Sequence, residues 1–347
     1  MSVTIPRPDD WHVHFRDGER LEAVVGATAA QFGRAIVMPN LKPPVTTTQA
    51  ALDYRERILA ALARSGGDPS RFNPLMTLYL TDQTDPDEVE LAVDSGAVFG
   101  VKLYPAGATT NSAAGVTQVE RIDPVLDRMA QVGLALLVHG EVTHDHVDIF
   151  DREARFLDEV LAPLLARHPD LKVVLEHCTT AAGCEFVASY GPRVGATITA
   201  HHLLATRNDM LVGGIKPHYY CLPVLKRFED RDALVAAATG DDDSFFLGTD
   251  SAPHPVEGKE SACGCAGSYT AHAAIELYAE VFDSVGKLDK LGDFASRRGP
   301  NFYGLPVSEE LVTLERGEWM APTELPFGGS VVKPWRADQP LQWRLVD

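Results

Sequence analysis

Eight short apolar runs, separated by longer segments of helical period, constrain the fold of this chain more than any other feature. The runs lie at residues 10–15, 34–38, 75–80, 98–103, 134–138, 172–176, 193–197 and 244–248. Short strands that are apolar along most of their length are typical of parallel sheets covered on both faces. Because helical segments alternate with the runs, the pattern predicts an α/β fold built on a parallel sheet.

The intervening segments carry the signals of amphipathic helices. Hydroxyl side chains at residues 46–48 can cap a following helix, and apolar residues recur at steps of three and four in residues 157–165. Residues 120–131 and 223–238 show the same pattern. Eight strands joined by helices predict a (β/α)8 TIM-type barrel, whose active site lies at the carboxyl ends of the strands. The alternative is an open doubly wound sheet, but no Gly-rich dinucleotide fingerprint follows the first strand.

The domain organisation is expected to be simple. A length of 347 residues allows two or three domains, but α/β barrels commonly run longer as one, and no linker or internal repeat is present. We predict one barrel domain over residues 1–347, with the barrel at about 5–306 and a tail at 307–347. The tail holds three of the four tryptophans, and we expect it to pack on the barrel.

The charge and the cysteine content exclude several classes of function. A formal net charge of −18 argues against nucleic-acid binding, which needs a basic surface, but allows a small anionic substrate in a local cationic pocket. No apolar run approaches the roughly 18 residues of a membrane span, and the N-terminus lacks a signal-peptide layout. Five sparse cysteines fit reduced thiols, so we expect a cytoplasmic protein without a membrane partner.

Metal-ligand side chains occur at the ends of several predicted strands. His12 and His14 end the first strand on the same face, and His139, His177 and Asp250 follow three others. A His-x-His pair alone is a weak signal, because two solvated imidazoles at a strand end are an equally simple explanation. In a barrel, however, all five side chains would converge at one rim. Imidazole and carboxylate ligands suit a divalent transition metal, and zinc most of all.

Lys102 lies in the apolar strand context of residues 98–104, where a buried ammonium group is costly. One interpretation is a lysine whose head group reaches solvent. The other is a neutral amine that takes up carbon dioxide and becomes a carbamate. That reaction converts a positive group into a carboxylate able to bridge two metals.

These ligand-type residues match, in order and type, the binuclear pattern of the amidohydrolase superfamily, which the sequence resembles. The closer resemblance is to the class II dihydroorotase family. It is carried by residues 7–18 (RPDDWHVHFRDG), 35–47 (AIVMPNLKPPVTT), 101–111 (VKLYPAGATTN), 138–143 (VHGEVT), 150–154 (FDREA) and 248–254 (GTDSAPH). The resemblance spans about residues 5 to 306 and becomes thin in the tail.

The resemblance implies two zinc ions per subunit, held by six side chains. The first metal would be bound by His12, His14 and Asp250, the second by His139 and His177, and both by Lys102 carboxylated at its amine (N6-carboxylysine). A bridging hydroxide would complete the centre. Asp250 would also act as the general acid and base.

The resemblance also implies how the substrate is held. Arg16 would clamp a carboxylate through its planar fork of donors, helped by Asn40 and His254. The backbone of Leu222 and Ala266 would contact ring amides. The full set expected to contact substrate is His14, Arg16, Asn40, His139, Leu222, His254 and Ala266.

The loop at residues 105–115 is rich in small residues and follows Lys102. Composition alone indicates a flexible connection. In the resembling family this loop is a lid, which implies that Thr109 and Thr110 reach the substrate.

The implied activity is the reversible cyclisation of N-carbamoyl-L-aspartate to L-dihydroorotate and water, a step of de novo pyrimidine (UMP) biosynthesis, by a homodimer. The alternatives are another cyclic amidase, such as a hydantoinase or allantoinase, and a non-catalytic scaffold barrel. The other histidines have no required place in this scheme, although His201 and His202 follow the seventh strand and could support the site. The pair Cys263 and Cys265 lacks the second cysteine pair of a structural zinc site.

Overall fold

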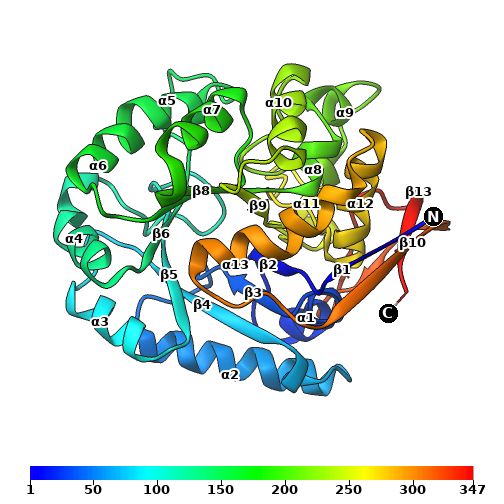
Figure 1. Ribbon diagram of the computed structural model, residues 1–347, viewed down its shortest axis with the longest axis horizontal. Helices are drawn as coiled ribbons and strands as arrows, with labels where there is room; N and C mark the ends of the chain where they lie inside the picture. The colour runs from blue at the N-terminus through cyan, green and yellow to red at the C-terminus, as the bar shows by residue number, and fades with distance from the viewer. Residues whose placement is uncertain (347) are drawn as a thin grey trace.

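A parallel eight-stranded barrel forms the centre of the computed structural model, which describes residues 1–346 (Figure 1). Its strands are β2 (Asp9–Val13), β3 (Arg34–Val37), β4 (Asn73–Tyr79), β5 (Val98–Leu103), β6 (Ala135–His139), β7 (Val173–Glu176), β8 (Val194–Ile198) and β9 (Phe245–Leu247). Each strand begins and ends within two residues of a predicted apolar run. The amide of Asp250 donates to the carbonyl of His12 (2.8 Å), and that of His14 donates to Ser251 (3.1 Å), which joins the last strand to the first. The predicted barrel is therefore confirmed.

Helices connect the strands and surround the barrel (Figure 1). They are α1 (Glu19–Gln31), α2 (Thr48–Arg64), α3 (Asp87–Asp94), α4 (Asp123–Val132), α5 (Arg152–Phe156), α6 (Ala162–Arg167), α7 (Ala181–Tyr190), α8 (Ala200–Leu204), α9 (Arg207–Leu211), α10 (Phe228–Thr239), α11 (Val256–Lys259), α12 (Ala274–Ser284) and α13 (Arg298–Tyr303). Thr47 caps α2 as predicted, since its side chain accepts from the amide of Ala50.

Two helical segments differ from the sequence pattern. A π-helical turn, η3 (Leu157–Leu161), separates α5 from α6, although the apolar positions continue through it. The helix predicted from residue 223 begins only at Phe228. The carboxylate of Asp230 accepts from the amide of Arg227 (3.3 Å), which fixes the first turn after that residue and leaves the preceding segment non-helical.

The lower part of the barrel lumen is filled by apolar side chains. Its residues come from strands all around the barrel and from α13: Trp11, Ile36, Met38, Leu75, Ala135, Leu137, Val174, Phe246 and Phe302. Trp11 stacks on Tyr303 with ring centroids 4.6 Å apart. His12, the next residue, also faces the lumen, because it reaches Glu176 on β7. Strict strand alternation forbids two consecutive inward side chains, but the pairing register of β2 with β3 shifts between Asp10 and Val13.

The tail and the N-terminus form a second, antiparallel sheet. Its order is β1 (Ser2–Pro6), β10 (Leu311–Met320) and β13 (Pro340–Leu345), and a short ribbon pairs β11 (Leu325–Pro326) with β12 (Val331–Val332). The chain ends therefore lie on the same side of the molecule, where β13 packs along α12 (Figure 1). The pattern analysis missed β1, since this short strand is half exposed and polar in alternation.

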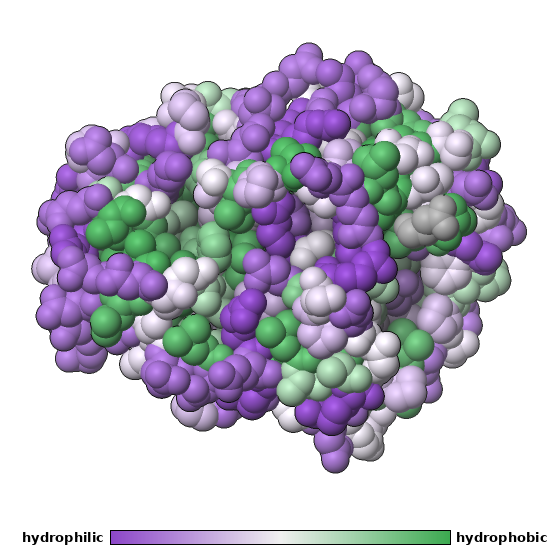
Figure 2. Space-filling model, turned by 60° about the horizontal axis from the view of Figure 1, so that its bottom comes forward, coloured by the Kyte–Doolittle hydropathy of each residue, from purple (hydrophilic) through white to green (hydrophobic). Residues whose placement is uncertain are grey.

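The outer surface is mixed in character. Figure 2 shows hydrophilic side chains over most of one face, with apolar groups in separate clusters between them. Among residues 1–346, no helix combines the length and the apolar character that a membrane crossing requires.

The packing of the tail yields a stability prediction. Trp343 on β13 is fully buried, accepts from the indole of Trp319 at its carbonyl (2.6 Å), and donates to Asp283 on α12 (3.3 Å). Replacing Trp343 with Ala should lower the free energy of unfolding by about 3–5 kcal/mol, because a large buried side chain leaves a cavity. Urea denaturation followed by circular dichroism measures this change.

The neighbouring Arg344 is exposed, so Arg344→Ala is the matched control and should change the free energy of unfolding by less than about 0.5 kcal/mol. Equal stability of the two variants would show that the tail does not stabilise the barrel.

Candidate metal centre and substrate pocket

Three of the predicted ligands meet directly at the carboxyl ends of the barrel strands. The ligand atoms of His12, His14 and Asp250 all lie within 4.8 Å of one another, and all three residues are buried. The Asp250 carboxylate is 3.2 Å from Nε2 of His14 and 3.5 Å from Nε2 of His12. Two imidazoles and one carboxylate at this spacing are suited to a divalent metal ion.

The other two histidines adjoin this group. The ring of His177 lies 5.0 Å from that of His12 and 4.8 Å from that of His139, centroid to centroid. Nδ1 of His177 is buried and has no hydrogen-bond partner among residues 1–346. Since a buried ring nitrogen normally has a partner, this atom is available as a ligand.

Lys102 completes the cluster. Its side chain is fully buried, and Nζ has no hydrogen-bond partner within the described residues. Burial lowers the pKa of Lys102 to about 8, although the nearby charges of Glu176 and Asp250 oppose this shift. The side chain therefore does not reach solvent as a snorkelling lysine would, and the neutral amine is accessible near neutral pH.

Two carboxylates orient the histidines, and the sequence analysis missed both. Nδ1 of His12 donates to Glu176 (2.7 Å), which leaves Nε2 facing Asp250. Nε2 of His139 donates to Glu141 (2.8 Å), which leaves its Nδ1 for another partner. Metal-binding histidines commonly have such a carboxylate partner on the second nitrogen. Their positions in the sequence could have indicated this role, because Glu176 directly precedes His177 and Glu141 follows His139 by two residues.

The protonation states also suit a metal. Burial lowers the pKa values of His12 and His177 well below the usual range, which keeps both rings neutral. Burial alone would raise the pKa of Asp250, but the hydrogen bond from His14 and the nearby imidazoles outweigh it and hold this pKa below its ordinary value. Neutral imidazoles and an ionised carboxylate are the forms that bind metal ions.

Three site residues have left-handed backbone conformations that non-glycine residues rarely adopt. Their φ values are 65° at Arg16, 41° at His177 and 43° at Asp250. Hydrogen bonds hold these conformations, since the amide of His177 donates to the hydroxyl of Thr197 (2.7 Å) and Tyr54 donates to the carbonyl of Arg16 (2.6 Å). Strain of this kind clusters at functional sites, where the surroundings determine the geometry.

The predicted anion-binding residues lie beside the cluster. Nε of Arg16 donates to the carbonyl of Pro253 (3.0 Å), and Nη2 lies 3.0 Å from Nε2 of His254. Burial and the charge of Arg16 lower the pKa of His254 to about 2, so this ring is neutral and Nε2 can accept from the guanidinium. The remaining guanidinium donors are available to an anion.

The predicted substrate residues line one small hollow. It is bordered by His12, His14, Arg16, Asn40, Tyr104, Thr109, Thr110, His139, His177, Leu222, Asp250, Ala252, Ala266 and Gly267. All of the sequence-predicted site residues except Lys102 and His254 are in this lining, and those two contact its wall. The hollow has a volume of about 20 Å³, which is room for about one water molecule.

The lid loop explains this small volume. Nδ2 of Asn40 donates to the carbonyl of Thr110 (3.1 Å), and Nδ2 of Asn111 donates back to the carbonyl of Asn40 (3.0 Å). The hydroxyl of Thr110 lies 3.4 Å from the carbonyl of Ala266 on the opposite wall. The loop therefore lies closed over the cluster. A ring-sized substrate needs the lid to open before it can enter.

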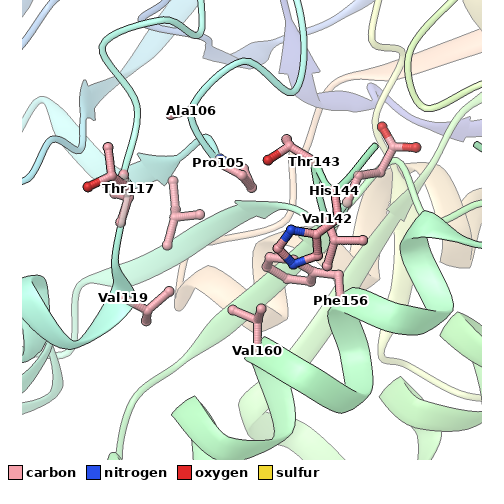
Figure 3. Close-up of a pocket in the computed structure, with 12 residues that line it drawn as sticks. Pro105, Ala106, Thr117, Val119, Val142, Thr143, His144, Phe156 and Val160 are labelled. Atoms are coloured by element: carbon pink, nitrogen blue, oxygen red, sulfur yellow. The ribbon is translucent and has the colours of Figure 1, made fainter. Parts of the chain in front are cut away.

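A larger cavity of about 240 Å³ lies beside the base of the lid (Figure 3). Val142, Phe156 and Val160 form one side of it, and Pro105 and Thr117 form the other (Figure 3). Its lining is mostly apolar and lacks a cluster of ligand-type side chains, so the smaller hollow is the better candidate for the chemistry.

A second group of ligand-type atoms consists of His201, His202 and Cys221, which are buried within 4.8 Å of one another. His202 already uses both ring nitrogens, at 2.7 Å from the hydroxyl of Thr199 and 3.0 Å from the carbonyl of Pro223. It is a satisfied core histidine rather than an available ligand.

The comparisons with known proteins agree with this geometry. Residues 9–309 match the sequence model of the amidohydrolase family. The dihydroorotase of Alkalilimnicola ehrlichii is 59% identical over 346 residues, which cover 100% of both chains. The crystal structure of dihydroorotase from Campylobacter jejuni is 36% identical and covers 100% of this chain and 98% of its own, with a TM-score of 0.90. Dihydroorotase from Saccharomyces cerevisiae in complex with 5-fluoroorotic acid is 33% identical and covers 99% and 98%, with a TM-score of 0.91.

The chain belongs to the amidohydrolase family, as the barrel and the ligand cluster at its rim indicate. Within that family it belongs to the dihydroorotases, because relatives with that name match it over its whole length. Both resemblances seen in the sequence are confirmed.

The role of Glu141 can be tested through metal retention. Replacing it with Gln removes the charge that orients His139, so a bound metal should be released about 10–100-fold more readily. Competition with a chelator, read by metal analysis of the desalted protein, measures this. Glu257→Gln is the control, because Glu257 is remote from the cluster and pairs with Ser330. Equal retention by both variants would contradict the orienting role.

Proposed function

We propose that this protein catalyses the reversible cyclisation of N-carbamoyl-L-aspartate to L-dihydroorotate and water. The observation that carries the proposal is a cluster of metal-ligand side chains next to an arginine that can receive a carboxylate. Dihydroorotate has one carboxylate and a ring of amides, so it needs both features. A hydantoinase or allantoinase shares the first requirement but has no ring carboxylate for Arg16 to bind.

The proposed metal centre contains two zinc ions. His12, His14 and Asp250 would hold one, and His139 and His177 would hold the other. The unpartnered nitrogen of His177 and the unpaired amine of Lys102 support this assignment, since both are buried where a polar atom requires a partner. When bound, such a metal pair lowers the pKa of water and polarises the carbonyl under attack.

Lys102 would serve as a carboxylated lysine. Its neutral amine forms a nitrogen–carbon bond to carbon dioxide and releases one proton, which yields a carbamate. The burial that lowers the pKa of Lys102 to about 8 supplies the neutral form that reacts. The product is an anion, and it replaces an amine that has no hydrogen-bond partner among the described residues.

Arg16 would anchor the substrate. Its guanidinium would form charge-assisted hydrogen bonds to the ring carboxylate, with Asn40 and His254 beside it. The backbone of Leu222 and Ala266 would meet the ring amides from the facing wall. Closure of Thr109 and Thr110 over the ring would exclude water and hold the reacting carbon near the cluster.

Asp250 would move the proton. Asp250 is ionised at neutral pH, and the ionised carboxylate is the form that can accept a proton. In ring opening it takes a proton from the attacking water and gives it to the departing ring nitrogen. In ring closure the ureido nitrogen bonds to the side-chain carboxylate carbon and Asp250 takes the nitrogen's proton. That proton and a second proton from solvent combine with one carboxylate oxygen, which leaves as water.

We further propose a homodimer in the cytoplasm, with the barrel and the tail as one domain. All five cysteines are free, which fits a reducing compartment. The dimer rests on the family resemblance alone.

The first test follows the ultraviolet absorbance of the dihydroorotate ring amide on purified protein. We expect ring opening that disappears after chelation and returns with zinc, because the metals activate the water. Zinc-loaded protein without turnover would overturn the proposed substrate. Hydantoins and allantoin would then be tested, and failure with those as well would favour the scaffold alternative.

The carboxylate clamp is tested by Arg16→Met. Loss of charge-assisted hydrogen bonds should reduce kcat/KM for dihydroorotate by about 100-fold or more, since each bond contributes roughly 1.5–3 kcal/mol. Zinc content should not change. Arg20→Met is the matched control, because Arg20 is exposed and lies over the ring of Phe327. Retained turnover in Arg16→Met would exclude Arg16 as the clamp.

A further inference from the structure

A buried lysine outside the metal cluster holds two walls of the substrate hollow together. Lys259, the last residue of α11, is only 3% exposed. Its ammonium group donates to three backbone carbonyls, those of Tyr220 (2.7 Å), Cys265 (2.8 Å) and Gly267 (2.8 Å). These carbonyls belong to two segments that are more than forty residues apart in the sequence.

The three carbonyls flank the backbone proposed to recognise the substrate ring. Cys265 and Gly267 stand on either side of Ala266, and Tyr220 lies two residues before Leu222. Leu222, Ala266 and Gly267 all line the hollow. Lys259 therefore joins the two segments that carry these residues.

Backbone contacts strengthen the same junction. The carbonyl of Tyr220 accepts from the amide of Gly267 (3.0 Å) as well as from Lys259. The amide of Cys265 donates to Gly258 (3.1 Å), which ties the segment to α11. Gly267 has a φ of 144°, and an added Cβ would lie 2.5 Å from the carbonyl of Ala252, so this segment passes close to the wall.

The chemistry of the junction suits an ammonium group. Three carbonyl dipoles converge on one point, and a lysine has three N–H donors with which to satisfy them. No carboxylate among the described residues forms an ion pair with Lys259, so its charge faces these three carbonyls and the ring of Tyr220, whose centroid is 5.7 Å away. Burial lowers the pKa of Lys259 to about 8, which shows how strongly the site is desolvated. Because all three N–H donors of Lys259 are used by backbone carbonyls, this ammonium group orders the backbone rather than binding a diffusible anion.

We propose that Lys259 is a positioning residue for substrate binding, which sets the spacing of the Leu222 and Ala266 backbone and thereby the affinity for the substrate ring. This inference rests on the proposed function of the hollow. Lys259 touches neither the metal ligands nor the reacting atoms, so its loss should change KM more than kcat.

The test replaces Lys259 with Met, which keeps the length of the stem and removes all three donors. The KM for dihydroorotate should rise by about tenfold or more, while kcat changes by less than about threefold, because uniform ring binding is lost. Zinc content should equal that of the unchanged protein. A role confined to folding would lower the active fraction, and with it kcat, but would leave KM the same.

Two further variants make the outcome decisive. Lys172→Met is the matched control, since Lys172 also donates to a backbone carbonyl, that of Phe302 (3.3 Å), but precedes β7 at the opposite end of the barrel. It should leave KM unchanged. Lys259→Arg keeps the charge and some donors, so its KM should lie between those of the unchanged protein and Lys259→Met. If Lys259→Met does not fold, the KM of Lys259→Arg decides the question, and an unchanged value overturns the proposal.

Hydrogen exchange gives a readout that does not depend on activity. The peptide that contains residues 263–268 should exchange faster in Lys259→Met than in the unchanged protein, because the Gly267 amide loses its ordered acceptor. Unchanged exchange together with unchanged KM would overturn the inference. Absence of turnover in the unchanged protein would instead count against the proposed function, and the exchange experiment would still report on Lys259.

Discussion

The rest of the site depends on one constraint, which is the burial of Lys102 without a hydrogen-bond partner in a space shared with four imidazoles. Removing an ammonium group from water is expensive, and the nearby charges of Glu176 and Asp250 offset that cost only in part, because the pKa of Lys102 still falls to about 8. The same desolvation keeps His12 and His177 neutral and lowers the pKa of Lys102. Neutral imidazoles beside the ionised carboxylate of Asp250 form a donor set that is complementary to divalent cations.

Apolar packing inside the barrel and hydrogen bonds between its strands hold this donor set in place. The apolar floor of the lumen, with Trp11 stacked on Tyr303, fixes the strand that carries His12 and His14. The shifted register in β2 lets Trp11 and His12 face the lumen together, so the same strand serves both the floor and the site. Glu176 receives hydrogen bonds from His12 and from the hydroxyl of Thr197, and that hydroxyl also holds the strained His177. The packing inside the barrel and these hydrogen bonds thus hold the strained backbone conformation of His177 at the carboxyl ends of the strands.

The sequence was sufficient for the barrel because each buried strand is a short apolar run. It also indicated which side chains gather at the rim, because His139, His177 and Asp250 follow such runs and His12 lies near the end of another. The sequence was not sufficient to predict those strands and side-chain roles that depend on tertiary contacts. The strand β1 exists only because β10 of the tail pairs with it. The orienting role of Glu176 depends on a contact across the lumen from β7 to β2, which strand alternation does not predict.

Backbone recognition was harder still to predict. The roles of Leu222 and Ala266 rest on resemblance, because a main-chain donor or acceptor leaves no mark on residue type. Closure of the lid through Asn40 and Asn111 was not visible either, since asparagine in a loop is equally typical of a turn. The signal for Lys259 was a lysine among small residues, and its significance appears only when three carbonyls from distant segments converge on it.

Three lysines in this protein are almost completely buried, and their partners rather than their burial determine what each can do. Lys102, Lys226 and Lys259 are 0%, 3% and 3% exposed. Lys226 donates to the carbonyl of Val224, and its charge opposes the rise in the pKa of Glu153 that burial causes, so it balances a buried carboxylate. Lys259 has three carbonyls and organises backbone. Lys102 has no hydrogen-bond partner among residues 1–346, and this is the observation that supports its proposed carboxylation.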